Sequence, residues 1–330
     1  MSRKVGIGIV GLGYMGNIHL RHLVKIRDVD CVAVADFSKK ALREAQSYGV
    51  RKRFVNYQDL VEDDDIDAVI IALPTHLHLQ CAAKVSEAGK DFLLEKPMAR
   101  NPQEAREILR LAEKNSVKLM MGYHLRFHRP FQKLKVKVEN RQLGDIEVAY
   151  ATFISSGPFF HRGGHTPVRV PEWWFDKNMS GGGALIDVGS HIVNLLRWYF
   201  GEIRDIKACF GHRFNLDFED SAVCFSRFES GTLGVITAGY FSQGFKLELE
   251  FFGSVNNAFA QHQPPNKLKA ATQMLMTGKS SFHQAHYDEL RYFVHCVAND
   301  LLPSPSGLDG VRDIEAIDRA YKNEIKMEQH

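Results

Sequence analysis

Near the start of the chain, the apolar run Val5–Val10 is followed directly by a glycine-rich hexapeptide, Gly11-Leu12-Gly13-Tyr14-Met15-Gly16. This G-x-G-x-x-G pattern, at the junction of a strand and a helix, is typical of a βαβ unit that binds a dinucleotide. Its glycines allow a tight turn, close approach of the pyrophosphate and close packing of the helix on the strand. The amide groups at the helix N-terminus then receive the phosphate charge. The motif predicts a phosphate-binding loop formed by Gly11, Gly13, Tyr14, Met15 and Gly16.

A carboxylate stands where such a unit holds the adenosine ribose. Asp36 ends the next apolar run, Cys31–Ala35, about 20 residues after the glycines, which is the expected spacing. A carboxylate there bonds the ribose 2′-hydroxyl and repels a 2′-phosphate, so the sequence favours NAD. Lys39 and Lys40 keep NADP as the less favoured alternative, because either lysine could neutralise a phosphate.

Within residues 1–123, short apolar runs alternate with stretches of helical pattern. This alternation predicts βαβ crossovers and a doubly wound parallel sheet with both faces covered. The expected strands are Val5–Val10, Cys31–Ala35, Ala68–Ala72, Phe92–Leu94 and Lys118–Met121, and the expected helices are Met15–Ile26, Lys39–Tyr48, Leu77–Ala88 and Pro102–Asn115.

From residue 124 to residue 330 the pattern predicts a second α/β domain. Around Phe131–Val138 a helix is favoured over a strand, although lysines alternate with apolar residues there. Consecutive strand-like segments with short connections then indicate a mostly antiparallel sheet. These segments are Glu147–Ser155, Ile203–His212, Ala222–Phe228, Thr232–Tyr240 and Phe245–Phe252. Helices are expected at His286–Ala298 and Gly310–Glu324, and the last helix could pack back on the first domain.

Composition narrows the class of protein. Lys plus Arg number 42 and Asp plus Glu 39, which gives a net charge of only +3, and the basic residues are scattered, so a nucleic-acid partner is not expected. The longest strongly apolar run, Ala68–Leu73, is far shorter than the roughly 18–20 residues of a membrane span. The five cysteines form no C-x-x-C pair, which favours free thiols in the cytoplasm. The 15 histidines include pairs such as His161 and His165, but no convergent ligand set is apparent, so no metal is expected.

Two further segments carry residues suited to proton transfer. Lys96, in Glu95-Lys96-Pro97, follows an expected strand at the edge where ligands of parallel sheets bind. A desolvated lysine beside a cationic ring can lose its proton near neutral pH, although a surface lysine is an equally simple reading. Asp187 and His191 are four residues apart, which places them on one face of a helix. A carboxylate can orient an imidazole and raise its basicity, but a plain surface contact also has this spacing.

These motifs, in this order and spacing, resemble the Gfo/Idh/MocA family, named for glucose–fructose oxidoreductase, inositol dehydrogenase and a rhizopine catabolism protein. The resemblance covers nearly the whole chain, and Glu95-Lys96-Pro97 is its most specific element. It implies a Rossmann domain followed by a domain with an open sheet that mediates dimers or tetramers. It also implies oxidation or reduction of a hydroxyl or ketone on a sugar, cyclitol or nucleotide sugar.

The resemblance also implies roles for individual residues. Lys96 matches the catalytic lysine, Asp187 and His191 match a substrate-binding and proton-relay pair, and the Lys96-Pro97 bond is expected to be cis. Further cofactor contacts are implied for Pro74, Thr75, His78, Glu95 and Lys96. Substrate contacts are expected for His124, Arg126 and Asn194. Trp174, just before the glycine run, is a further substrate candidate on its own chemistry, because an aromatic face suits the C–H surface of a sugar, although such aromatics more often belong to the core.

Two of these positions depart from the family pattern. His124 stands where an asparagine is common, which fits a different substrate. Asn194 stands where an aspartate often follows the histidine, and an amide cannot take up a proton. A hydrolase that retains NAD for transient oxidation, and an NAD-binding sensor without activity, remain as alternative functions.

Overall fold

The computed structural model describes residues 4–157, 171–242, 244–262 and 281–326, and it divides into two compact units. Unit 1 comprises Met1–Ala99, Gln103–His124 and His283–Val311. Unit 2 comprises Arg100–Pro102, Leu125–Phe282 and Arg312–His330. The chain therefore returns to unit 1 after residue 282.

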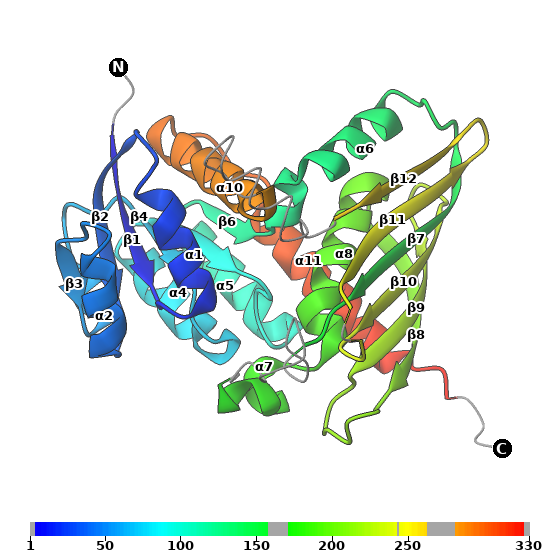
Figure 1. The fold of residues 1–330 in the computed structure, drawn as a ribbon, viewed down its shortest axis with the longest axis horizontal. Coiled ribbons are helices and arrows are strands. Elements are labelled where there is room, and N and C mark those ends of the chain that lie inside the picture. Colours follow the sequence, from blue (N-terminus) through cyan, green and yellow to red (C-terminus); the bar gives the residue numbers. More distant parts are fainter. Residues whose placement is uncertain (1–3, 158–170, 243, 263–280, 327–330) are drawn as a thin grey trace. The chain divides into compact units, whose positions relative to one another are not determined.

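Unit 1 is built on a six-stranded parallel sheet in the order β3-β2-β1-β4-β5-β6 (Figure 1). Its strands are β1 (Val5–Val10), β2 (Val29–Ala35), β3 (Lys52–Phe54), β4 (Ala68–Ile71), β5 (Asp91–Glu95) and β6 (Leu119–Gly122). Its helices are α1 (Tyr14–Leu23), α2 (Lys39–Gln46), α3 (Tyr57–Val61), α4 (His78–Glu87), α5 (Pro102–Lys114) and α10 (Ser281–Ala298), with the short η1 (Thr75–Leu77) before α4. Every residue of β1 and β4 is buried, as expected for central strands covered on both faces. The predicted doubly wound parallel sheet is confirmed.

Unit 2 contains a second six-stranded sheet, in the order β12-β11-β7-β10-β9-β8 (Figure 1). Its strands are β7 (Ile146–Ile154), β8 (Ile203–Gly211), β9 (Ser221–Phe228), β10 (Leu233–Gly239), β11 (Lys246–Gly253) and β12 (Asn257–Gln261). All neighbours pair antiparallel except β7 and β10, which are parallel, so the expected mostly antiparallel sheet is confirmed. Its helical segments are η2 (His124–Phe127), α6 (Arg129–Glu139), η3 (Glu172–Phe175), α7 (Lys177–Ser180), α8 (Ala184–Phe200) and α11 (Gly307–Lys322), of which η2 and α11 begin in unit 1.

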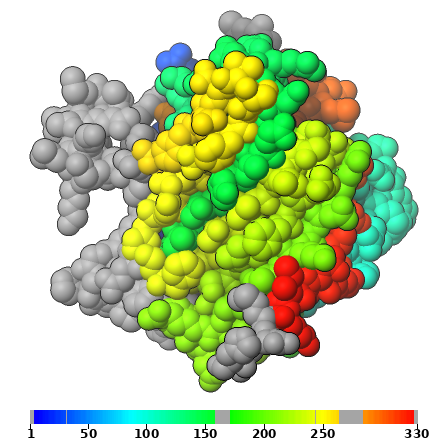
Figure 2. Space-filling model, turned by 90° about the vertical axis from the view of Figure 1, so that its right-hand side faces the viewer, coloured from blue at the N-terminus to red at the C-terminus, as the bar shows by residue number. Residues whose placement is uncertain are grey.

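The two faces of the second sheet differ. Helix α8 packs on one face, against β7, β9 and β10, and the strands alternate buried and exposed residues accordingly. Figure 2 shows the opposite face, where the strands lie at the surface and no described helix covers them. Large apolar side chains are exposed there, among them Tyr150, Phe225 and Phe259.

Candidate active site

The glycine-rich loop of unit 1 has the geometry that the motif predicts. Gly11 has φ +91°, and a Cβ at this position would come within 2.5 Å of the Ala72 carbonyl oxygen. Gly13 is exposed, and a Cβ there would meet nothing within 4 Å, so the loop leaves open space beside its backbone. Helix α1 begins at Tyr14 with Gly13 as its N-cap, and glycine brings no side chain to cover the first amides. These amides can therefore receive a phosphate.

Asp36 lies next to this loop because its carboxylate is bonded to the loop backbone. Its Oδ2 accepts a hydrogen bond from Leu12 N over 2.7 Å, and its Oδ1 accepts one from Ser38 N over 2.7 Å. The carboxylate is thus held at the end of β2 and keeps lone pairs for further donors such as ribose hydroxyls. The open loop and this oriented carboxylate fit the phosphate and ribose groups of NAD.

The loop after β4 carries three of the predicted cofactor residues, Pro74, Thr75 and His78. Pro74 is half-buried, whereas Thr75 and His78 are buried. The His78 ring nitrogens lie 3.1 Å from the Met98 carbonyl oxygen and 2.9 Å from the Leu73 carbonyl oxygen. Burial lowers the pKa of His78 despite these backbone contacts. His78 therefore joins the loop after β4 to the loop after β5, and its contact with a cofactor stays a prediction.

Lys96 directly follows β5 and is half-buried. The Lys96-Pro97 peptide bond is cis, so this prediction is confirmed. Lys96 N donates a hydrogen bond to Glu95 Oε2 over 3.1 Å, and Glu95 Oε1 lies 2.7 Å from His19 Nε2. The Glu95 carboxylate is thus engaged inside unit 1, where it supports the peptide that carries Lys96.

His124, a predicted substrate residue, belongs to unit 1. Its ring stacks on that of His286 from α10, with centroids 3.9 Å apart and an interplanar angle of 17°. The His286 ring also meets the His19 ring edge-on, at 6.5 Å between centroids. The first residue of η2 therefore stacks on an imidazole of α10, which in turn contacts an imidazole of α1.

In unit 2, Asp187 and His191 lie one turn apart on α8, as their spacing predicted. The start of this helix is fixed by close packing, because a Cβ on Gly183 would lie 1.8 Å from the Glu219 carbonyl oxygen. The partly buried Asp187 accepts a hydrogen bond at Oδ2 from Tyr240 Oη over 2.6 Å. His191 is 5% exposed, and its ring lies 5.8 Å from that of Phe153 on β7.

Trp174 lies close to the same group of residues in unit 2. Its ring centroid is 5.2 Å from that of Tyr240 and 5.7 Å from that of Phe218. The side chain is half-buried and packs against a cluster that includes Ala184 and Val188 of α8. Trp174 thus shares the neighbourhood of Asp187, with part of its surface exposed.

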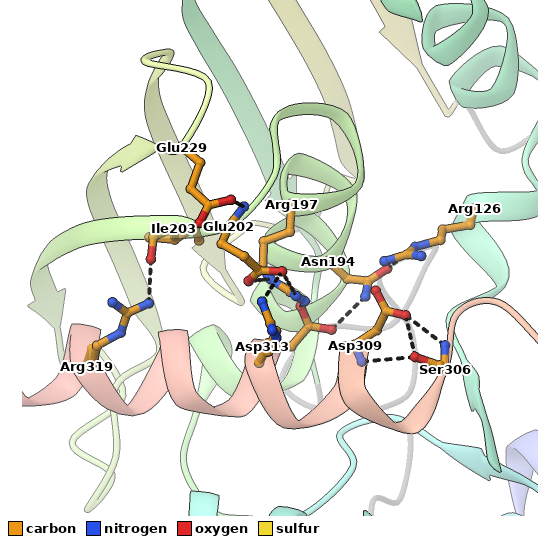
Figure 3. A network of polar contacts seen from close by, with 11 residues as sticks. Arg126, Asn194, Arg197, Glu202, Ile203, Glu229, Ser306, Asp309, Asp313 and Arg319 are labelled. Atoms are coloured by element: carbon orange, nitrogen blue, oxygen red, sulfur yellow. Dashed lines mark hydrogen bonds and ion pairs between the residues drawn. The ribbon is translucent and has the colours of Figure 1, made fainter.

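Asn194 and Arg126, both predicted to bind substrate, belong to a buried polar network in unit 2 (Figure 3). Arg126 Nε donates to Asn194 Oδ1 over 2.7 Å, and Asn194 Nδ2 donates to Asp313 Oδ2 over 2.6 Å. Asn194 is 0% exposed. The amide therefore links an arginine to a carboxylate through both of its polar atoms, and a role in substrate binding stays a prediction.

Arg197 extends the network to Asp313 and Glu202 (Figure 3). Its guanidinium donates to Asp313 Oδ1 over 2.5 Å and to both carboxylate oxygens of Glu202 over 2.7 and 2.9 Å. Burial alone would lower the pKa of Arg197, but the charge of Asp313 and the hydrogen bonds to Glu202 outweigh burial and raise it. The network fixes α8 against α11 from within unit 2.

Two residues of these sites have no sequence motif that reveals them. His19 lies on α1 beyond the glycines, and only the fold shows that it meets Glu95. Tyr240 ends a strand-like stretch in the sequence and reaches Asp187 across 53 positions of the chain. Both contacts depend on tertiary packing, which no local spacing encodes.

The described residues contain neither a candidate metal site nor a candidate membrane span. Among these residues, no group of three or more histidine, cysteine, aspartate or glutamate side chains could hold a metal ion. His161 and His165 lie outside the described residues. None of the helices in the described ranges combines the length and the apolar character of a membrane span.

The fold and these residues define an oxidoreductase with a dinucleotide-binding Rossmann unit and a second unit built on an open sheet. Comparison with known families agrees. Residues 5–123 match the oxidoreductase family with an NAD-binding Rossmann fold, and residues 131–257 match the GFO/IDH/MocA C-terminal domain. The chain therefore belongs to the Gfo/Idh/MocA family.

Individual relatives are similar over most of their length. Myo-inositol 2-dehydrogenase of Thermotoga maritima is 28% identical over 321 residues, which cover 92% of this chain and 91% of that protein. The scyllo-inositol 2-dehydrogenase (NAD(+)) of Bacillus subtilis is 26% identical over 347 residues, covering 99% and 97%. The crystal structure of a probable dehydrogenase from Thermotoga maritima has a TM-score of 0.83 at 26% identity, covering 97% of this chain and 96% of that chain.

Proposed function

We propose that the chain is an NAD-dependent dehydrogenase that oxidises a hydroxyl group of a cyclitol or sugar. The observation that carries the proposal is the Asp187 carboxylate on α8, held by Tyr240 and one helical turn from His191. The other unit of the same chain presents a glycine loop and Asp36 suited to NAD. The similar inositol dehydrogenases support a cyclitol or a related polyol as substrate.

The proposed chemistry assigns one task to each residue. Bound NAD supplies the hydride acceptor. The substrate hydroxyl must lose its proton as the hydride leaves, so a base has to lie within about 2.6–3.2 Å of that oxygen. We assign contact with this hydroxyl to Lys96 and His191, either of which can take the proton. Asp187 orients the His191 imidazole and balances the positive charge that forms on it.

Cofactor binding is assigned to unit 1. Helix α1 and the loop from Gly11 to Gly16 hold the pyrophosphate, and Asp36 holds the ribose hydroxyls. The loops after β4 and β5 line the nicotinamide end, with Pro74, Thr75, His78, Glu95 and Lys96 as candidates. NADP remains less favoured because Asp36 repels a 2′-phosphate.

Recognition of the substrate ring is assigned to polar and aromatic side chains. Trp174 is partly exposed, and an aromatic face suits the C–H surface of a sugar or cyclitol. His124 and Arg126 are further candidates, whereas Asn194 would act through Arg126 because its own amide is engaged. A nucleotide sugar is the alternative substrate class.

We also propose that the enzyme is a homodimer or homotetramer. The uncovered face of the second sheet exposes Tyr150, Phe225 and Phe259 by 45%, 51% and 54%. A broad face with such side chains normally marks a protein interface. A cytoplasmic location is proposed because Cys81, Cys209, Cys224 and Cys296 are all free thiols.

A panel assay tests this function against its alternatives. Purified protein is mixed with NAD and myo-inositol, scyllo-inositol, D-glucose, levoglucosan or UDP-glucose, and NADH is followed by absorbance. A dehydrogenase reduces NAD in proportion to the polyol consumed. Cleavage of an aryl glucoside without net NADH would instead indicate the NAD-retaining hydrolase, and NAD binding without turnover of any compound would indicate the sensor.

A further inference from the structure

A buried tyrosine supports the Asp187 carboxylate within unit 2. Tyr240 directly follows β10, is 1% exposed, and donates a hydrogen bond from Oη to Asp187 Oδ2 over 2.6 Å. We propose that Tyr240 is a positioning residue, which keeps the Asp187 carboxylate ionised and fixes its orientation on the helical turn that leads to His191. This inference rests on the proposed function, in which Asp187 orients His191.

The tyrosine itself is fixed at both ends. Its backbone N–H donates to the carbonyl oxygen of Asp220, the residue directly before β9, over 2.9 Å. This bond anchors the backbone of Tyr240. Its ring packs against Trp174, with centroids 5.2 Å apart. On the backbone of Gly157, a Cβ would lie only 2.7 Å from Cγ and 2.8 Å from Cδ1 of this ring. The ring therefore has little freedom, and the hydroxyl is directed at one acceptor.

The hydroxyl also remains a donor. Burial and the negative charge of Asp187 raise the pKa of Tyr240 well above its ordinary value, and Glu219 and Tyr321 act in the same direction. The phenol thus keeps its proton across the pH range in which dehydrogenases are assayed. A carboxylate that accepts a hydrogen bond is stabilised in its ionised form. Without the hydroxyl, Asp187 would take up a proton more readily and would be free to rotate.

The chain offers a matched control for this tyrosine. Tyr199 is also a buried tyrosine of unit 2, and its Oη donates to the Phe131 carbonyl oxygen over 2.7 Å. Tyr199→Phe and Tyr240→Phe each delete one buried hydroxyl and keep the ring. A structural effect should be similar in both variants, whereas an effect through Asp187 should appear only in Tyr240→Phe.

The first measurement does not depend on activity. Carbon-13 NMR of the Asp187 carboxyl group, in protein labelled at aspartate, follows its protonation as pH falls. We expect the midpoint to lie at higher pH in Tyr240→Phe than in the wild type, and to be unchanged in Tyr199→Phe. An unchanged midpoint in Tyr240→Phe would overturn the inference, whether or not a substrate has been found.

The second measurement uses the substrate that the panel identifies. The Tyr240 hydroxyl donates a hydrogen bond to a charged group, and such a bond stabilises the carboxylate more than a bond between neutral groups does. Its loss in Tyr240→Phe should therefore lower kcat about tenfold. KM should change little, and the acidic limb of the pH–rate profile should move to higher pH. In the Asp187→Ala background, Tyr240→Phe should have no further effect on kcat, because its target is gone. An equal loss of kcat in the wild-type and Asp187→Ala backgrounds would show that Tyr240 acts only on the structure, and it would overturn the inference.

The proposed function and this inference fail in different ways. If Lys96→Met and Asp187→Ala both keep wild-type turnover, the assigned chemistry is wrong and the inference falls with it. If those variants lose turnover while Tyr240→Phe keeps the wild-type kcat and pH–rate profile, only the inference is overturned.

Discussion

His19 Nε2 lies 2.7 Å from Glu95 Oε1, and the two side chains are 0% and 6% exposed. The other Glu95 oxygen accepts a hydrogen bond from the backbone of Lys96, so this pair connects α1 to the peptide of the candidate catalytic lysine. A second carboxyl group, Glu289 on α10, is fully buried, and the negative charge of Glu95 repels its ionised form. Neither Glu289 oxygen has a hydrogen-bond partner among the described residues. Unit 1 thus buries two acidic side chains that interact through their charges, and one of them pairs with an imidazole.

Glu289→Gln should stabilise the protein increasingly as pH rises. Burial, and then the charge of Glu95, raise the pKa of Glu289 well above its ordinary value of 4.5. The folded state therefore holds the proton more tightly than the unfolded state, and wild-type stability falls with pH from about 4.5 up to the raised pKa. Glutamine does not titrate, so the variant keeps its stability over this pH range. Its free energy of unfolding should therefore exceed that of the wild type by about 1.4 kcal/mol more for each pH unit in that window. Urea denaturation at several pH values measures the difference.

Glu107→Gln is the control for this prediction. Glu107 lies on the surface of α5, and its hydrogen bond with Arg110 lowers its pKa. This variant should gain nothing as pH rises, because the folded state does not retain the proton. A constant difference between Glu289→Gln and the wild type over the same pH range would contradict the argument.

Sequence patterns predicted most of the fold because the strands at the centre of each sheet are either continuously apolar or regularly alternating. Strand β1 was predicted with its observed ends, Val5–Val10. Strand β3 was missed because Lys52-Arg53-Phe54 is short and charged, which an edge strand tolerates. Strand β12, the other edge strand that was missed, is also short.

The candidate site was predictable only where chemistry and local spacing coincide. The glycine loop, and the pair Asp187 and His191 on α8, follow from spacing along one helix or turn. The contacts His19–Glu95 and Tyr240–Asp187 join residues 76 and 53 positions apart, so they depend on packing that local patterns do not contain. The sequence also could not predict the hydrogen bonds of the Asn194 amide, because its partners Arg126 and Asp313 come from distant segments of the chain.

Asp36→Ala should relax the preference of the enzyme for NAD over NADP. Asp36 is held beside the glycine loop through Leu12 N and Ser38 N, where its charge opposes a 2′-phosphate. Removing it should weaken NAD binding and improve NADP binding, as measured by calorimetry with each dinucleotide. Asp59→Ala, on α3 of the same unit, should leave the ratio unchanged. A wild type that binds NADP at least as tightly as NAD would refute the assignment of Asp36.

Asp313→Ala should destabilise the protein far more than Arg312→Ala. Asp313 is fully buried and bonds to Arg197, so its removal leaves a buried guanidinium short of one anionic partner, at a cost of about 3–5 kcal/mol. The neighbouring Arg312 pairs with Glu202 over 3.0 Å but is 43% exposed, so its loss should cost less than about 1 kcal/mol. Denaturant unfolding of both variants checks the order, and equal losses would argue against a structural role of the network.

Phe225→Lys should shift the assembly toward the monomer. Phe225 is an exposed residue of β9 on the uncovered sheet face, where it pairs across strands with Val235 of β10 and Lys207 of the edge strand β8. A lysine charge buried there in an interface would destabilise the assembly. Val136→Lys changes an exposed residue of α6 and should leave the assembly intact. Light scattering at micromolar concentration distinguishes the two variants. A wild-type mass equal to one chain of 37.4 kDa would rule out the proposed oligomer.

Lys96→Met and His191→Ala should each reduce turnover and leave NAD bound. If Lys96 and His191 contact the reacting hydroxyl, losing either one removes positioned acid–base catalysis, which should cost about 10²–10⁴ in rate. Loss of a mere binding contact would instead raise KM with little change in kcat. We expect Lys96→Met to abolish most turnover with nearly wild-type NAD affinity in calorimetry, and His191→Ala also to shift the pH–rate profile. Lys114→Met, on α5, serves as the control for loss of a lysine charge. Should both site variants keep kcat within a few-fold of wild type on the identified substrate, the proton would have to leave through other groups, and the catalytic assignment would be wrong.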